Sequence, residues 1–228
     1  MLSPETPAEG RKRAAAEGAL ELVRAGMVVG LGTGSTARYF IEGLGERVSR
    51  GLEVSAVVTS TDSRRRAEAC GIPLADRVDG PIDLTVDGAD EISPSIDCIK
   101  GRGGALLREK IVAHASRRFV LIADDSKLVE RLGRGPVPIE VLGFLWESTG
   151  AAIAALGGTP QLRMAADGPF RTDNGNLVLD VRFAAVDPDL GSRLHQIPGV
   201  IEHGLFFGMA RGAIVAGPAG LRVLGELG

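Results

Sequence analysis

The sequence predicts an α/β protein in two parts: a domain built on a parallel sheet, and a smaller α+β domain with ferredoxin-like order. Short apolar strands such as VSAVV and FVLIA alternate with helical segments up to about residue 132, which indicates a parallel sheet covered on both faces. After the loop GRGPVP (133–138) the pattern changes to strand–helix–strand–strand–helix–strand. The 228 residues, 44% of them apolar, are enough to bury a core in each part.

The first domain opens with an alanine-rich helix, a strand that ends in glycines, and a second helix. Later strands and helices continue the alternation, and Gly71 ends one of these helices. The expected elements are a helix from about Pro7 to Gly26, a strand at 27–31, a helix at 35–48, a strand at 53–59, a helix at 62–70, a strand at 83–87, a helix at about 104–116 and a strand at 118–123. Ligands of such sheets bind beyond the carboxyl ends of the strands, so the loops there are the candidate site.

The second domain has its own set of elements. We expect a strand at 139–142, a helix at about 146–156, strands near 160–165 and at 176–183, a helix near 189–196 and a strand at 199–206. The Asn174–Gly175 pair is typical of a tight hairpin and is expected to join the two central strands. The apolar stretch 212–217 and the following LRVLGEL are expected to complete the first domain. The predicted domains are therefore 1–132 with 207–228, and 133–206.

Composition and charge exclude several classes of function. A net charge of -3 and only 7 Phe, 1 Trp and 1 Tyr argue against a nucleic-acid binder, which needs positive charge and aromatic stacking. No apolar run approaches the roughly 18 residues of a membrane span, and none follows the basic cluster near the N-terminus, so we expect a cytoplasmic protein. The two cysteines form no disulfide framework and the three histidines show no metal-ligand spacing, so we expect no metal site.

The loop GLGTGSTA (30–37) ends a strand in closely spaced glycines and opens a helix with Ser35 and Thr36. Such a turn exposes backbone N–H groups at the positive end of a helix, which suits a phosphate or a sugar hydroxyl. It is a weak dinucleotide motif, because Ser35 stands where a third glycine belongs and the next strand ends in TST (59–61) instead of an acid. The alternative is a tight turn with a helix N-cap and no ligand.

The segment DLTVDGADEI (83–92) places Asp87 at the end of a strand, followed by a glycine turn, Asp90 and Glu91. Carboxylates clustered at such a position suit proton transfer. Two alternatives remain open: a turn whose aspartates cap backbone N–H groups, and a site for a divalent cation.

The segment KGRGGALLREK (100–110) carries Lys100 before a glycine-rich turn and Glu109 on the following helix. Ala105, Val112 and Ala113 share the helix face of Glu109, and a poorly solvated carboxylate is a candidate general base. Lys100 is suited to neutralise an oxyanion, as proton abstraction beside a carbonyl requires. The flanking Arg108 and Lys110 are expected to be exposed.

Lys127 follows the strand FVLIA and therefore also reaches the carboxyl edge of the sheet. Lysine is scarce among the 26 basic residues, and only Lys12, Lys100, Lys110 and Lys127 are lysines. Two of these four lie on candidate site loops, at positions 100 and 127. The three histidines, at 114, 195 and 203, are expected to be structural or exposed.

These motifs, in this order, resemble those of ribose-5-phosphate isomerase of the A type over nearly the whole chain. The residues that carry the resemblance are GLGTGSTA (30–37), TSTD (59–62), DLTVDGADEI (83–92), KGRGGALLREKIVA (100–113), ADDSKLV (123–129), TDNGNLVLDV (172–181) and IPGV (197–200). The resemblance implies a Rossmann-like catalytic domain and a smaller α+β lid or oligomerisation domain. It also implies no metal or nucleotide cofactor, and a homodimer or homotetramer.

The resemblance further implies roles for individual residues in the conversion of ribose 5-phosphate to ribulose 5-phosphate. Glu109 matches the base that moves the C2 proton through an enediolate, and Asp87 matches the acid–base group for ring opening. Lys100 and Asp90 match groups that bind hydroxyls and stabilise the oxyanion. The matching substrate-binding positions are Thr33, Gly34, Ser35, Thr36, Gly88, Ala89, Gly101, Arg102, Gly103 and Lys127. Arg102 is a departure, because glycine is frequent there in the family.

Two other classes of function remain as alternatives. A nucleotide-dependent oxidoreductase would share the fold class, although the missing ribose-binding acid disfavours it. A sugar-phosphate sensor or an acyl/CoA transferase of related fold would bind a similar ligand without isomerising it. Conversion of ribose 5-phosphate distinguishes the isomerase from all of them.

Overall fold

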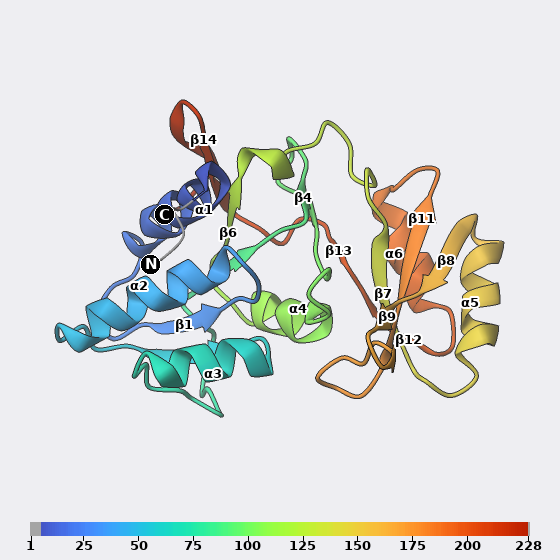
Figure 1. Cartoon of the computed structure of the whole chain (residues 1–228), viewed down its shortest axis with the longest axis horizontal. Helices are drawn as coiled ribbons and strands as arrows, with labels where there is room; N and C mark the ends of the chain where they lie inside the picture. The colour runs from blue at the N-terminus through green and yellow to red at the C-terminus, as the bar shows by residue number, and fades with distance from the viewer. Residues whose placement is uncertain (1–5, 228) are drawn as a thin grey trace. The chain divides into compact units, whose positions relative to one another are not determined.

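A computed structural model describes residues 6–227 and divides the chain into two compact units (Figure 1). The first unit comprises the described residues up to Ala89, 111–127 and those from 208 onward; the second comprises 90–110 and 128–207. Residues 90–110, which the sequence-based division placed in the first domain, group with the second unit. The division falls inside helix α4 (Leu106–His114).

A six-stranded sheet forms the first unit, in the order β15–β14–β6–β3–β1–β2. Its strands are β1 (Val28–Leu31), β2 (Ser55–Val58), β3 (Leu84–Gly88), β6 (Phe119–Asp124), β14 (Gly212–Gly217) and β15 (Gly220–Gly225). All neighbours are parallel except β14 and β15, which form an antiparallel hairpin at one edge. The expected parallel sheet and the return of the C-terminal segment to it are confirmed.

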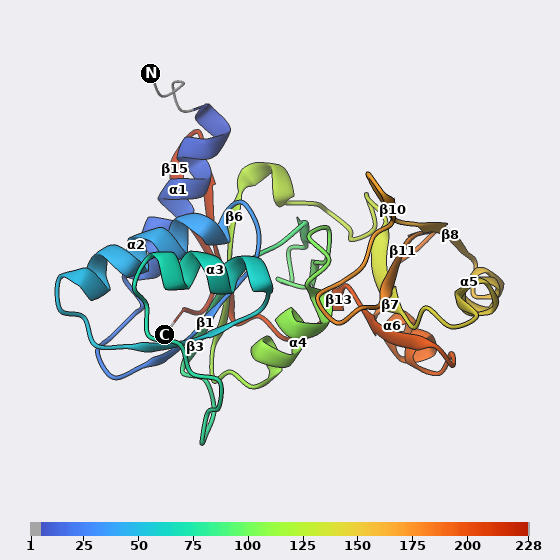
Figure 2. The same ribbon diagram turned by 60° about the horizontal axis from the view of Figure 1, so that its bottom comes forward.

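Three helices share one apolar core with this sheet: α1 (Pro7–Leu20), α2 (Ala37–Ser49) and α3 (Thr61–Ala69). Figures 1 and 2 show α2 between α1 and α3. Side chains alternate across a strand, so Val29 and Leu31 enter this core while Gly30 faces Val112 of α4 on the other side. Within residues 6–227, no helix is long and apolar enough to cross a membrane.

The carboxyl ends of β1 and β3 form the topological switch point of the sheet. β1 pairs with β2 on one side and with β3 on the other. After β1 the chain adds β2 at one edge, and the later strands β3, β6 and β14 are added on the opposite side of β1, so the strand order reverses there. Open α/β sheets bind ligands in the crevice at such a point. The glycine loop after β1 and the DGAD turn at the end of β3 both lie at it.

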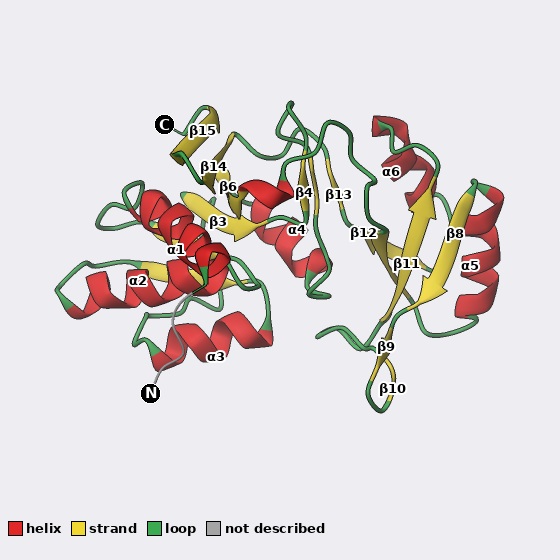
Figure 3. Ribbon diagram, turned by 45° about the horizontal axis from the view of Figure 1, so that its top comes forward, coloured by secondary structure: helices red, strands yellow, loops and turns green. Residues whose placement is uncertain are grey.

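The second unit contains a four-stranded antiparallel sheet in the order β12–β7–β11–β8. Figure 3 shows the paired strands β11 and β8 next to α5. Its elements are β7 (Val137–Val141), α5 (Trp146–Ala155), β8 (Gly158–Leu162), β11 (Leu177–Phe183), α6 (Pro188–His195) and β12 (Val200–His203). The chain order places the first and third strands at the centre, which is the ferredoxin-like arrangement. Both helices supply buried residues, among them Ile153 and Leu194, to one core with the sheet.

Two details of the second unit differ from the sequence-based expectation. The turn at Asn174–Gly175 does not join β8 to β11 directly, because the short hairpin β9 (Met164–Ala165) and β10 (Gly168–Pro169) lies between them. The expected strand at 199–206 is two strands, β12 and β13 (Leu205–Phe206), separated by Gly204. β13 pairs with β5 (Cys98–Ile99), which pairs with β4 (Glu91–Ile92), in a small sheet that the sequence did not reveal. A strand of two residues is too short to show the alternation of apolar and polar side chains from which strands are predicted.

Candidate active site

The loop between β1 and α2 is shaped by glycines for two different reasons. A Cβ atom at Gly32 would lie 2.1 Å from Asp87 Oδ1 and 2.6 Å from Asp87 Cα, so any side chain there would collide with the end of β3. Gly34 adopts a φ of +113°, which side chains disfavour. Gly34 and Ser35 are exposed, and the N-cap residue Thr36 makes no side-chain capping bond. The loop therefore presents backbone at a helix N-terminus, and capping by Ser35 does not explain it.

A cluster of hydroxyl groups supports this loop from the neighbouring strand end. Thr33 Oγ1 lies 2.7 Å from Thr59 Oγ1, 2.8 Å from Ser60 Oγ and 3.2 Å from Ser63 Oγ. Ser60 also caps α3 by accepting from the Ser63 N–H at 3.0 Å. The sequence analysis noted the segment TSTD (59–62) for its missing acid and for the family resemblance, but it did not predict that these hydroxyl groups contact Thr33. The signal was present, since hydroxyl residues follow directly where β2 ends.

Asp87 is held rigidly at the end of β3. Its side chain is buried, and Oδ1 accepts hydrogen bonds from the Thr33 N–H at 3.0 Å and the Gly88 N–H at 2.7 Å. Gly88 and Ala89, which follow, are half-buried. The carboxylate that the sequence singled out thus lies directly beside the glycine loop.

Lys127 ends a single 3-10 turn, Asp125–Lys127, directly after β6. Asp124 is buried and accepts from the Ser126 N–H at 3.0 Å, which shapes the turn. Lys127 is half-buried at the carboxyl edge of the sheet, as its position after the strand predicts. Within the first unit, the structure therefore groups positions 33–36, 87–89 and 127 at one edge.

In the second unit, Lys100 and Glu109 form a buried ion pair. Lys100 Nζ lies 3.3 Å from Glu109 Oε1, and the two side chains are 2% and 6% exposed. Lys100 follows β5, and Glu109 lies in the first turn of α4. The glycine-rich turn between them allows the chain to fold back, so the two charges predicted for the site meet.

An arginine that sequence reasoning missed supports this turn. Gly101 and Gly104 have φ values of +109° and +78°, and the Gly104 N–H donates to the Gly101 carbonyl at 3.0 Å. Arg163 donates to the Gly101 carbonyl at 2.9 Å and to the Arg102 carbonyl at 3.0 Å, and it forms a two-fold contact with Asp180. Nothing in a short sequence window connects Arg163 with this turn, because the contact is purely tertiary.

Asp90 and Glu91 are neighbours in the sequence, but their carboxylates bind different segments. Asp90 Oδ2 accepts from the Arg102 N–H at 2.9 Å, and the exposed Arg102 side chain has its Nε 3.8 Å from Asp90 Oδ1. Gly103 beside it is exposed. Glu91 is buried and accepts from three successive N–H groups of the loop 133–135. Asp90 therefore contacts the glycine-rich turn that follows Lys100, whereas Glu91 holds the loop 133–135 in place.

The prediction of exposure holds for the side chain of Arg108, which is 39% exposed, and is wrong for Lys110. Arg108 donates to Asn174 Oδ1 at 2.8 Å and to the Asp173 carbonyl at 3.0 Å. Lys110 Nζ donates to Glu202 Oε1 and to the His203 carbonyl, each at 2.6 Å, and its side chain is only 14% exposed. Both residues find partners that lie far along the chain, which helix periodicity does not reveal.

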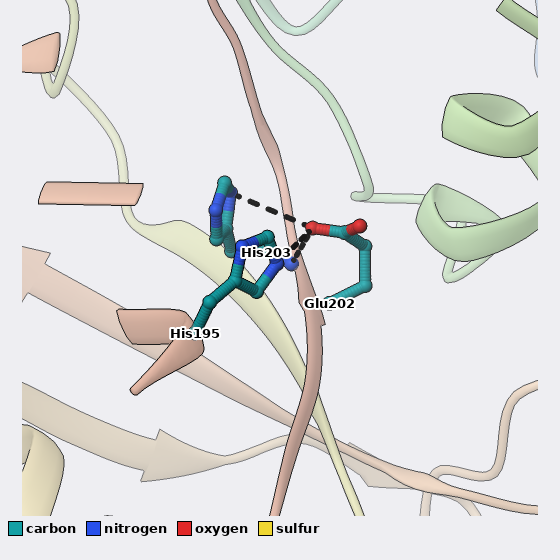
Figure 4. A group of neighbouring side chains, drawn as sticks. All are labelled: His195, Glu202 and His203. Carbon is teal, nitrogen blue, oxygen red and sulfur yellow. Dashed lines mark hydrogen bonds and ion pairs between the residues drawn. The ribbon is translucent and has the colours of Figure 1, made fainter. Parts of the chain in front are cut away.

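Among the residues described, one group of side chains has a geometry that could hold a metal ion, and Lys110 contacts this group. His195, Glu202 and His203 place one ligand atom each within 4.8 Å of one another (Figure 4). Lys110 Nζ, however, already contacts two of these three residues, at 2.6 Å from Glu202 Oε1 and 3.2 Å from His203 Nδ1. Burial, and then the nearby Lys110, lowers the pKa of His203 to about 3, so this ring is neutral. The cluster is an ion-pair network centred on Lys110.

The fold and the site residues define a class of protein. In the first unit, an α/β sheet presents a glycine loop, hydroxyl groups and Asp87 at its switch point. The second unit, by itself, contains a carboxylate and an ammonium that are buried together. Such groups transfer protons on a small, hydroxylated anion, so the class is an α/β enzyme of proton transfer.

Comparison with known proteins identifies the family. The family model described as ribose 5-phosphate isomerase A (phosphoriboisomerase A) matches residues 55–220. The chain is 50% identical over 228 residues to ribose-5-phosphate isomerase A of Bradyrhizobium diazoefficiens, covering 93% of this chain and 94% of that protein. It is 50% identical over 217 residues to the same enzyme of Gluconobacter oxydans, covering 92% and 94%. The chain belongs to the ribose 5-phosphate isomerase A family, an aldose–ketose isomerase family.

Solved structures agree with this assignment. A D-ribose-5-phosphate isomerase in complex with phospho-erythronic acid has a TM-score of 0.93 and 40% identity, and the match covers 97% of this chain and all of that one. Ribose 5-phosphate isomerase A of Methanocaldococcus jannaschii has a TM-score of 0.92 and 37% identity, covering 96% and 99%. The predicted family, fold class and isomerase activity are confirmed.

Proposed function

We propose that Glu109 is the base with which this isomerase interconverts ribose 5-phosphate and ribulose 5-phosphate. The observation that carries the proposal is the buried Lys100–Glu109 pair, with its charged atoms 3.3 Å apart. Aldose–ketose isomerisation moves protons without redox change, so it requires a base and a positive charge and no nicotinamide. Family membership favours this reaction over the oxidoreductase, sensor and transferase alternatives.

The reaction divides into two proton transfers at carbon. Glu109 removes the C2 proton of the open-chain aldose, the C–H electrons form the C1–C2 double bond, and the C1 oxygen gains negative charge. The Lys100 ammonium stabilises that charge. Glu109 then returns a proton to C1, while the hydroxyl proton on C2 passes to the C1 oxygen, and the carbonyl of ribulose 5-phosphate forms at C2.

Ring opening and substrate binding fall to the remaining residues. Asp87 takes the proton of the C1 hydroxyl and delivers a proton to the ring oxygen, which opens the furanose. The two N–H groups bound to its Oδ1 support this role, because they fix its position. Asp90 binds substrate hydroxyls. The proposed binding positions are Thr33, Gly34, Ser35, Thr36, Gly88, Ala89, Gly101, Arg102, Gly103 and Lys127.

Exchange of the C2 proton in heavy water tests the assignment of the base. Glu109→Gln removes the base but keeps the shape of the side chain, so ribose 5-phosphate should bind while exchange falls at least about 10³-fold. Glu46→Gln makes the same change on a side chain that is 70% exposed, and it should exchange as the wild type does. Retained exchange in Glu109→Gln would assign the base to another group, with Asp87 the first to examine.

An inhibitor provides a second test. The related enzyme solved with phospho-erythronic acid binds a phosphorylated sugar acid. A planar carboxylate resembles the planar, negatively charged enediolate, and transition-state analogues bind more tightly than substrates. We expect the same acid to compete with ribose 5-phosphate here, with an inhibition constant below KM. Non-competitive inhibition would contradict a shared site.

We also propose that the enzyme is a homodimer or homotetramer. The loop after β7 exposes three apolar side chains close together, Leu142 (45%), Phe144 (75%) and Leu145 (62%). Exposed apolar patches mark interaction surfaces. Sedimentation should give a mass of two or four chains, and Phe144→Glu should shift it toward one chain. A wild-type protein that sediments as a single chain would refute the proposal.

A further inference from the structure

The base Glu109 is followed by a lysine whose side chain is enclosed by the segment Glu202–Phe206. Lys110 Nζ donates to Glu202 Oε1 and to the His203 carbonyl, both at 2.6 Å. It also lies 4.9 Å from the centroid of the Phe206 ring, which is fully buried. A buried ammonium with a carboxylate, a carbonyl and an aromatic face has its position restricted from several directions.

The same segment holds Lys100. The Lys100 N–H donates to the Gly204 carbonyl at 2.9 Å, and β13 pairs with β5 immediately before Lys100. Lys100 Nζ lies 5.8 Å from the Phe206 ring centroid, so this ring contacts both ammonium groups. A Cβ atom at Gly204 would lie 2.0 Å from the Lys100 carbonyl oxygen, so close approach of the two backbones requires glycine there.

These contacts connect the two members of the Lys100–Glu109 pair through one short segment. Adjacent residues of a helix point about 100° apart, so fixing Lys110 fixes the rotation of α4 and the direction in which Glu109 points. The backbone of Lys100 is fixed by the same segment. The distance between ammonium and carboxylate in the site therefore depends on the Glu202–Phe206 segment.

We propose that Lys110, Glu202 and Phe206 are positioning residues that set the geometry of Glu109 against Lys100. The proposal rests on the proposed function, in which Glu109 is the base and Lys100 stabilises the oxyanion. None of the three has to touch substrate. A base displaced by a fraction of an ångström loses its alignment with the C2 proton, which reduces turnover far more than binding.

The principal variant is the double substitution Lys110→Met with Glu202→Gln. It removes the ion pair and leaves no buried unpaired charge, so the protein should fold. We expect kcat for ribose 5-phosphate to fall about 10- to 100-fold with KM within about threefold of wild type. A role in stability alone would change the melting temperature and leave kcat of the folded protein unaltered.

Two further variants and one matched control separate geometry from charge. Glu202→Gln alone keeps an oxygen acceptor for Lys110 and so keeps part of the positioning; kcat should fall by about threefold, less than in the double variant. His195→Gln alters a 48% exposed ring that contacts the same Glu202 Oε1 at 3.0 Å, and as the matched control it should retain wild-type kcat. Phe206→Leu keeps an apolar side chain but removes the shared ring, and it should lower kcat about 5- to 10-fold.

The outcomes distinguish the two proposals. Wild-type kcat in the folded double variant and in Phe206→Leu would overturn the positioning role and leave the proposed function intact. Normal exchange of the C2 proton in Glu109→Gln would overturn the proposed base, and with it the positioning role. If the double variant does not fold, the kcat of Phe206→Leu tests the positioning role by itself, because this substitution changes no charge.

Discussion

Lys100 and Glu109 come from opposite ends of one glycine-rich segment, and Lys100 Nζ lies 3.3 Å from Glu109 Oε1 with both side chains almost fully buried. Water screens this pair poorly, so the ammonium exerts a strong field at the carboxylate and at any oxyanion formed beside it. The folded protein thus keeps a carboxylate and an ammonium in contact in the interior of the second unit.

Removing the ammonium should therefore affect chemistry more than binding. We expect Lys100→Met to lower kcat about 10²- to 10³-fold, because the enediolate loses its positive neighbour. Steady-state kinetics with ribose 5-phosphate measures the loss, and calorimetric titration of the variant checks that substrate still binds. A folded variant with kcat within tenfold of wild type would show that another group stabilises the oxyanion.

Chelation should leave the activity intact. In the proposed mechanism the Lys100 ammonium supplies the positive charge that proton abstraction requires, so none of the proposed steps needs a divalent ion. Protein dialysed against a chelator should convert ribose 5-phosphate at the rate of untreated protein. Loss of activity that a divalent ion restores would contradict this mechanism.

Gly32 should be intolerant of even a methyl group. A Cβ there would lie 2.6 Å from the Cα of Asp87, and backbone cannot move aside as a side chain can. We expect Gly32→Ala to lower the free energy of unfolding by about 3 kcal/mol and to reduce activity, measured by urea unfolding and kinetics. Gly10→Ala is the control: Gly10 lies in α1, and a methyl group added there would have no neighbouring atom within 4 Å, so this change should stabilise by about 0.5–1 kcal/mol.

His203 should make stability depend on pH in the mildly acidic range. Burial, followed by the charge of Lys110, lowers the pKa of His203 from 6.5 to about 3. Below pH 6.5 the unfolded chain binds a proton that the folded protein does not, so stability falls as the pH falls until about pH 3. Between pH 7 and 5 the wild type should lose about 2 kcal/mol more than His203→Asn, measured by urea unfolding. Parallel losses in the two proteins would contradict the buried neutral ring.

Much of the site follows from short stretches of sequence. Apolar runs predict the strands, and glycines or acids directly after a run predict its carboxyl end, which is how Gly32 and Asp87 are found. Lys100 is found because it precedes a glycine-rich turn. The glycine turn after Lys100 predicts a close return of the chain. The matching order of these motifs specifies the family, and the comparisons confirm it.

Other features depend on partners that no short window contains. Asp90 and Glu91 are adjacent acids in one motif. The Glu91 carboxylate, however, accepts hydrogen bonds from the N–H groups of a loop some forty residues away in the chain. The sequence predicts an exposed Lys110 and does not single out Arg163, yet both side chains are largely buried, at 14% and 13% exposed. The strand expected at 199–206 is divided at Gly204, where the Lys100 backbone passes.

Local patterns alone therefore specify the longer strands and the helices, the switch-point loops and the identity of the candidate base and cation. These depend on side-chain alternation and backbone freedom, which act over a few residues. Only the tertiary structure decides which charges are buried together, which acid anchors a loop and which segment holds Lys110. The free energy of a buried charge depends on its partner, and the chain brings that partner from a distance when it folds.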